Sequence, residues 1–251
     1  MSSSSRGSVF RQTLQQLNGA QKSGAGVPAY TRWVNRRVAR VFAASAVALG
    51  IGPNGVTAIS ATVSACGIAL LMLATPSIPM GLLAAFLLAL GYALDSADGQ
   101  VARVTGASSP AGEWLDHVVD SIRTPCIHVA VLVGFIRFPQ HFSPEPWMPS
   151  SWALWWVPLA FSVLTAGHFM SQILAEQLRR TRKTAAPSTG GTLRSFVNLH
   201  MDAGTLCWIF VFWGFGPLFV LIYALLFVAN AATVLISMRR KFVSLSHSAE
   251  H

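Results

Sequence analysis

Apolar residues occur along this chain in long blocks, and short polar segments separate the blocks. Most of the blocks reach the roughly 20 residues that a helix needs to cross the hydrocarbon core of a membrane. The pattern therefore predicts an all-α polytopic membrane protein with six transmembrane helices. The predicted spans are Val56–Thr75, Ile78 to about Asp98, Gly112–Phe138, Ser151–Ala175, Gly204–Phe215 with some preceding residues, and Pro217–Met238.

Polar and basic segments flank this predicted domain, which covers residues 51–241. Residues 1–27 are rich in Ser and Gly and lack an apolar core, which predicts a disordered N-terminal leader. Residues 28–50 mix arginines with Trp33 and valines, as an amphipathic helix in the membrane interface does. We favour this helix over a simple basic flank because the segment GIGPNG at 50–55 then supplies a turn into the bilayer. Residues 242–251 are predicted to form a cytoplasmic tail.

Composition agrees with the membrane class. The chain is 53% hydrophobic and 11% charged. It is therefore more apolar and less charged than an ordinary water-soluble domain. The net charge of +9 would suit nucleic acid, but the basic residues stand at the ends of apolar blocks and form no patch with interleaved aromatics. We therefore predict no nucleic-acid partner. The basic loops alternate along the chain, so the positive-inside rule places both termini and the polar segment near residue 105 in the cytoplasm, with the cell membrane as the location.

Five of the nine acidic residues fall within one segment, LDSADGQVARVTGASSPAGEWLDHVVDS, at 94–121. Asp95 and Asp98 stand three residues apart and share one helix face, and Asp116 and Asp120 stand four apart on the next helix. The segment TGASSP between them predicts a tight turn. An antiparallel helix hairpin would then bring four carboxylates together about one turn inside the cytoplasmic membrane surface.

Such a group of carboxylates requires positive charge, because the acids repel one another and are costly inside a bilayer. An arginine could pair with one or two of them. Hard oxygen donors without a Cys or His set favour Mg²⁺, Mn²⁺ or Ca²⁺, and two ions would resemble the two-metal sites of phosphoryl-transfer enzymes. Gly99, Ala102 and Gly112 share these faces. Helix packing alone could explain such small residues, but beside four aspartates they favour a ligand cleft.

The complete pattern is Asp-x2-Asp-Gly-x2-Ala-Arg-x8-Gly-x3-Asp-x3-Asp, from Asp95 to Asp120. It resembles the motif of the CDP-alcohol phosphotransferases, also called CDP-alcohol phosphatidyltransferases. PNGVT at 53–57 is similar to the family's Pro-Asn-x-x-Thr. The resemblance implies a membrane transferase that moves a substituted phosphate group from a CDP-alcohol to an acceptor hydroxyl and releases CMP, in the biosynthesis of phospholipids or related phosphodiester lipids.

The resemblance also implies roles for residues. Two divalent cations, Mg²⁺ or Mn²⁺, would be held by Asp95, Asp98, Asp116 and Asp120. Asp120 would also be the catalytic general base. The CDP pocket would be lined by Gly99, Ala102, Arg103, Gly112, Asn54 and Thr57. A homodimer in the lipid bilayer, with its active site open to the cytoplasm, is implied as well.

The substrates stay open at this point, since either CDP-diacylglycerol or a CDP-linked polar alcohol can be the donor and either an alcohol or a lipid the acceptor. The sequence around Asp116, SSPAGEWLDHVVDS, resembles that of choline- or ethanolamine-type transferases and favours this type. Candidates for the second substrate are Arg123, His168, Gln172 and Arg194. Arg123 could equally pair with Asp120 or Glu113, and Arg194 could equally lie in a solvated loop. The row His168, Gln172 and Glu176 favours a cavity face.

A cation transporter is the alternative from another functional class, because acidic residues inside a membrane also mark ion pathways. Such a pathway would need polar residues that continue to the far side. After Arg123 the third span continues as TPCIHVAVLVGFI, in which His128 alone is ionisable. The one-sided acids favour an enzyme, and the complete motif argues against an inactive relative.

Overall fold

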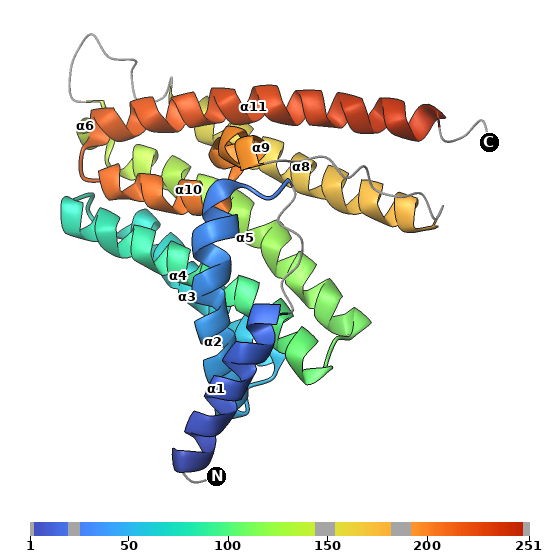
Figure 1. Ribbon diagram of the computed structural model, residues 1–251. Helices are drawn as coiled ribbons and strands as arrows, with labels where there is room; N and C mark the ends of the chain where they lie inside the picture. Colours follow the sequence, from blue (N-terminus) through green and yellow to red (C-terminus); the bar gives the residue numbers. More distant parts are fainter. Residues whose placement is uncertain (1–2, 20–25, 144–153, 182–191, 248–251) are drawn as a thin grey trace.

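The computed structural model describes residues 3–19, 26–143, 154–181 and 192–247, and all regular elements in these ranges are helical (Figure 1). In chain order they are α1 (Ser3–Gly19), η1 (Thr31–Asn35), α2 (Arg36–Leu49), α3 (Pro53–Leu73), α4 (Ile78–Thr105), α5 (Pro110–Arg137), α6 (Pro139–Phe142), α8 (Trp156–Thr181), α9 (Thr192–Val197), η2 (Asn198–Met201), α10 (Ala203–Trp208), η3 (Ile209–Phe212) and α11 (Gly216–His247).

Five of the described helices are long and apolar enough to cross a membrane: α3, α4, α5, α8 and α11. A sixth span exists if the bent pair Ser195–Met201 and Ala203–Phe212 is counted as one. The prediction of an all-α polytopic membrane protein is therefore confirmed. Figure 1 shows α8 and α11 running beside each other and α3 packed along α4.

The fifth span, predicted at Gly204–Phe215 with some preceding residues, corresponds to a bent pair of helical segments. Its two halves meet at an angle of 52°, and Asp202 stands at the break with an extended backbone. The Asp202 carboxylate is 2% exposed and accepts hydrogen bonds from the backbone N–H groups of Thr31 and Gly204 and from Thr31 Oγ1. Because these long-range bonds satisfy a buried carboxylate, they hold the break in place.

Residues 3–19, which belong to the predicted N-terminal leader, form the helix α1. Leu17 is 1% exposed and packs in a small core with Ala39, Ala43 and Val101. The burial of this side chain against α2 and α4 stabilises a helix that its polar composition alone does not indicate. Residues 29–49 are helical, with a π-helical turn at η1, and their position in the membrane interface stays a prediction. At the other end α11 continues to His247, so residues 242–247 of the predicted tail are helical.

Trp213 and two glycines fix the broken span against α4 and α5. Trp213 is 1% exposed. A Cβ at Gly134 would lie 2.6 Å from the Trp213 ring, and one at Gly81 would lie 2.5 Å from the Phe210 carbonyl oxygen. The two spans can approach η3 this closely because neither glycine carries a side chain.

We expect Gly81→Ala to lower the thermal stability of the protein in detergent, by about 1–3 kcal/mol for overpacking. The added methyl group would meet backbone, which cannot rotate away. Gly167→Ala is the control, since a Cβ there would make an ordinary contact of 3.7 Å with Met238. Equal melting temperatures of the two variants would contradict this account of the packing.

Candidate active site

Three aspartates meet where α4 ends and α5 begins. Asp95, Asp98 and Asp116 each offer a carboxylate oxygen, and these oxygens all lie within 4.8 Å of one another. Asp95 and Asp98 are buried, and Asp116 is half-buried. The helix periodicity and the intervening turn therefore bring acids from two helices together, as their spacing predicted.

The turn between the two helices has sharply defined ends. Gly106 closes α4 in the left-handed conformation with φ of 68°, which favours glycine. Ser109 caps α5, its Oγ accepting a hydrogen bond of 3.1 Å from the Gly112 N–H, and Pro110 is the first helical residue. These signals fix the register of α5 relative to α4, and so the position of Asp116 relative to Asp98.

Thr57 ties α3 to the acidic group. Its Oγ1 donates to Asp98 Oδ2 at 2.6 Å, and both side chains are buried. Thr57 lies in the first turn of helix after Pro53. The segment PNGVT, which resembles the family pattern, therefore supplies a hydrogen bond to one of the clustered carboxylates.

Arg123 lies between two of the four motif aspartates. Its Nη1 is 3.0 Å from Asp95 Oδ1, and its Nη2 forms an ion pair with Asp120 Oδ1. The Arg123 and Asp95 side chains are each 10% exposed, and that of Asp120 is 28% exposed. Of the two pairings considered for Arg123, the described geometry contains the one with Asp120. Asp120 itself is outside the group of three and is joined to it through Arg123.

The donor set fits a hard divalent cation. Three carboxylates within 4.8 Å offer only oxygen atoms, as Mg²⁺ and Mn²⁺ prefer. Arg123 offsets part of the negative charge on Asp95 and Asp120. One cation positioned among Asp95, Asp98 and Asp116 would offset more of the negative charge of this group.

A pocket of about 610 Å³ opens beside this group. All six residues expected to bind CDP line it, together with Asp98 and Asp116. The close approach of its walls explains one glycine, because a Cβ at Gly112 would press against Asn54 and Ser109 at 3.2 Å. The lining also contains residues that the motif did not identify: Pro53, Ala107, Ser108, Ser109, Pro110, Glu113, His117 and Glu176.

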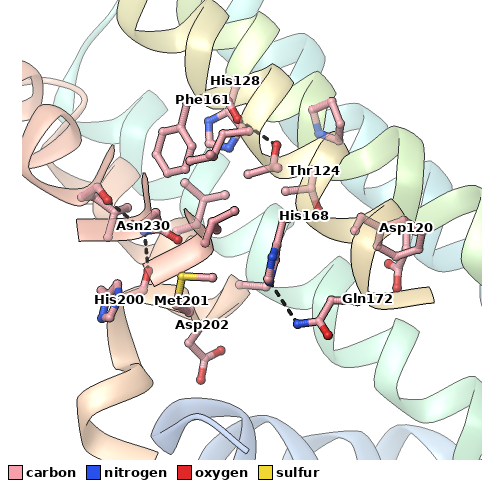
Figure 2. Close-up of a pocket in the computed structure, with 18 residues that line it drawn as sticks. Asp120, Thr124, His128, Phe161, His168, Gln172, His200, Met201, Asp202 and Asn230 are labelled. Carbon is pink, nitrogen blue, oxygen red and sulfur yellow. Dashed lines mark hydrogen bonds between the residues drawn. The ribbon is translucent and has the colours of Figure 1, made fainter. Parts of the chain in front are cut away.

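A second pocket, of about 200 Å³, has Asp120 in its lining (Figure 2). His168 and Gln172, two candidates for the second substrate, line it and hydrogen-bond to each other at 3.1 Å. Arg123 does not belong to its lining, and the side chain of Arg194 lies outside the part of the structure that is described. The lining also contains Thr124, His128 and Asn230, which sequence reasoning did not identify as site residues. Their distance along the chain gives no local signal that they share a pocket.

Fold and site together define a multi-pass membrane protein with an acidic pocket at the ends of two spanning helices. The family model for CDP-alcohol phosphatidyltransferases matches residues 51–236, which is most of the chain. The protein therefore belongs to the CDP-alcohol phosphatidyltransferase family, whose members transfer a group from a CDP-alcohol during lipid biosynthesis. A comparison with curated protein sequences gave no match.

Removal of Arg123 tests the charge balance. We expect Arg123→Met to lower the melting temperature in EDTA strongly, because breaking a buried ion pair costs about 3–5 kcal/mol. Mg²⁺ should raise the melting temperature of this variant more than that of the wild type, since bound metal would offset the negative charge that Arg123 no longer compensates.

Arg137→Met is the matched control on the same helix, where the arginine is exposed and lies 5.7 Å from the Phe138 ring. This variant should respond to Mg²⁺ as the wild type does. An Arg123→Met protein that Mg²⁺ leaves unchanged would contradict metal binding at the aspartates.

Proposed function

We propose that the protein transfers a substituted phosphate group from a CDP-alcohol to an acceptor hydroxyl and releases CMP, with the aid of two divalent cations, Mg²⁺ or Mn²⁺. The observation that carries the proposal is the group of Asp95, Asp98 and Asp116 beside a pocket lined by the other residues of the motif. A pocket that combines clustered carboxylates with Arg103 suits a metal-bound pyrophosphate.

The CDP moiety occupies the larger pocket in this proposal. Pro53 and Pro110 line it, so the N-termini of both α3 and α5 face the pocket. Helix N-termini carry unpaired N–H groups and partial positive charge, which favour phosphate oxygens. Arg103 adds a full positive charge, and the small side chains at Gly99, Ala102 and Gly112 leave room for the nucleotide.

The first task of the aspartates would be to bind the cations. Asp95, Asp98 and Asp116 hold the cations, with Asp120 contributing to their binding. Bound cations of this kind neutralise charge on the pyrophosphate and on the departing CMP. Thr57 holds Asp98 in place through the hydrogen bond of 2.6 Å, which limits the orientations that this carboxylate can adopt.

Asp120 would be the general base. It lines the smaller pocket and forms an ion pair with Arg123, which limits the orientations that its carboxylate can adopt. An acceptor hydroxyl there transfers its proton to Asp120 while its oxygen bonds to the donor's β-phosphorus. The bond from that phosphorus to the CMP oxygen breaks, and CMP leaves with the electron pair.

The active site and both termini would face the cytoplasm, and the protein would reside in the cell membrane as a homodimer. Arg103 and the arginine-rich end of α8 lie on the same side of the helix bundle as the aspartates. This agrees with the positive-inside rule. A cation transporter is not supported. Within the described part of α5, His128 is fully buried and hydrogen-bonded to Tyr223, so it does not extend the acidic group toward the far side.

The proposed mechanism predicts that Asp120→Asn lowers the rate of CMP release by about 10²–10⁴-fold, because the amide cannot accept the proton. The assay uses purified protein in lipid with Mg²⁺ or Mn²⁺ and a panel of CDP-alcohols and acceptors. Ser121→Ala is the control for folding, since Ser121 donates locally to Val118 O. CMP release from none of the CDP compounds, or an undiminished rate in Asp120→Asn, would refute the mechanism.

A further inference from the structure

The smaller pocket has walls from three long helices. The α8 wall repeats at intervals of three or four residues, from Phe161 through Thr165 and His168 to Gln172. The α11 wall is made by Leu226, Asn230 and Val234, and the α5 wall includes Asp120 and His128. Regular spacing on each helix means that one face of each is turned to the same space, which makes this a cavity built into the bundle.

The pocket extends from the proposed general base into the apolar interior. Asp120 and His128 are eight residues apart on α5, which is about 12 Å along a helix. At the deep end the Phe161 ring stacks on the His128 ring at 3.9 Å, and Leu226 and Leu206 complete the wall. A ligand with its hydroxyl at Asp120 would therefore place the rest of its body among apolar side chains.

Two imidazole nitrogens in this pocket have no hydrogen-bond partner among the residues that the structure describes. His128 Nδ1 is 2.7 Å from the Tyr223 hydroxyl, but its Nε2 is buried and unpaired, and His128 is 0% exposed. His168 Nδ1 is also buried and unpaired, while its Nε2 contacts Gln172. Buried polar atoms are rarely left without partners because this costs about 1–3 kcal/mol each. The pocket is thus equipped for a ligand that carries hydrogen-bonding oxygens.

The charges around the pocket oppose an anionic ligand. Asp120 and Asp202 line it, and its described lining contains no Lys or Arg. Arg123, which lies outside the lining, is paired with Asp95 and Asp120, and Lys241 donates to Ser171 Oγ at 3.4 Å. Within the described lining, a phosphorylated acceptor would meet two carboxylates and no cation.

We propose that this pocket binds the acceptor and that the acceptor is an uncharged lipid alcohol of the diacylglycerol type. The inference rests on the proposed function and deepens it, and we combine this lipid acceptor with a CDP-linked polar alcohol as the donor. The ester oxygens of such a lipid match the unpaired imidazole nitrogens, and its acyl chains match the apolar deep wall. A phosphorylated polyol conflicts with the charge of the pocket, and a free polyol conflicts with the apolar wall.

The first test compares three donor and acceptor pairs in vesicles with Mg²⁺ or Mn²⁺. They are a CDP-linked polar alcohol (CDP-choline, CDP-ethanolamine or CDP-glycerol) with diacylglycerol, CDP-diacylglycerol with glycerol 3-phosphate, and CDP-diacylglycerol with inositol. We expect CMP release at least about tenfold faster in the first pair. Faster release in the second or third pair overturns the lipid acceptor but leaves the proposed function intact, whereas release in none overturns both.

The second test uses variants and separates the KM values of the two substrates. His168→Phe and Gln172→Leu should each raise the KM for diacylglycerol by about threefold to tenfold, as expected for a lost hydrogen bond. The KM for the CDP donor should change less than twofold. Gln177→Leu, an exposed position on the same helix, and Lys241→Gln should leave both values unchanged. An increase confined to the donor KM, or a large effect of Lys241→Gln on the acceptor KM, overturns the assignment.

Discussion

Negative charge at the junction of α4 and α5 is the constraint around which the neighbouring elements are arranged. Carboxylates packed this closely in an apolar bundle repel one another and lose hydration, so each needs a compensating partner. Arg123 serves Asp95 and Asp120, and Thr57 serves Asp98. Compensation of the remaining charge by a divalent cation would make metal binding part of the same balance, which is why the site and its local stability are coupled.

Another buried carboxylate, that of Asp202, connects η1 to this site. Asp202 accepts hydrogen bonds from Thr31, and Thr31 Oγ1 lies 2.7 Å from the Tyr92 hydroxyl. Because that Thr31 hydroxyl donates to Asp202, the Tyr92 hydroxyl donates to Thr31. Tyr92 stands one turn before Asp95 on α4, and the Arg123 guanidinium lies 5.9 Å from its ring. The break in the fifth span and the orientation of Arg123 therefore depend on one connected set of contacts.

The sequence was sufficient to predict features that local spacing determines. Helix periodicity and the turn between the two helices bring Asp98 and Asp116 together, so the hairpin could be inferred from spacing. The residues expected in the larger pocket followed from the family resemblance. The helical leader and the bent fifth span could not be inferred in either way. Leu17 depends on burial against distant helices, and Thr31 and Asp202 are separated by 171 positions. Such pairings have no local signature, since tertiary packing selects them.

The same distinction explains why the motif does not determine the acceptor. The motif occupies α4 and the start of α5, and its residues surround the larger pocket. The smaller pocket shares Asp120 with the motif, but its other walls come from α8, the bent span and α11. If the smaller pocket binds the acceptor as proposed, substitutions at His168, Gln172 or Asn230 would alter the acceptor while the residues of the larger pocket stay the same. Acceptor specificity would then depend on the walls of the smaller pocket, which combine an apolar deep end with two carboxylates.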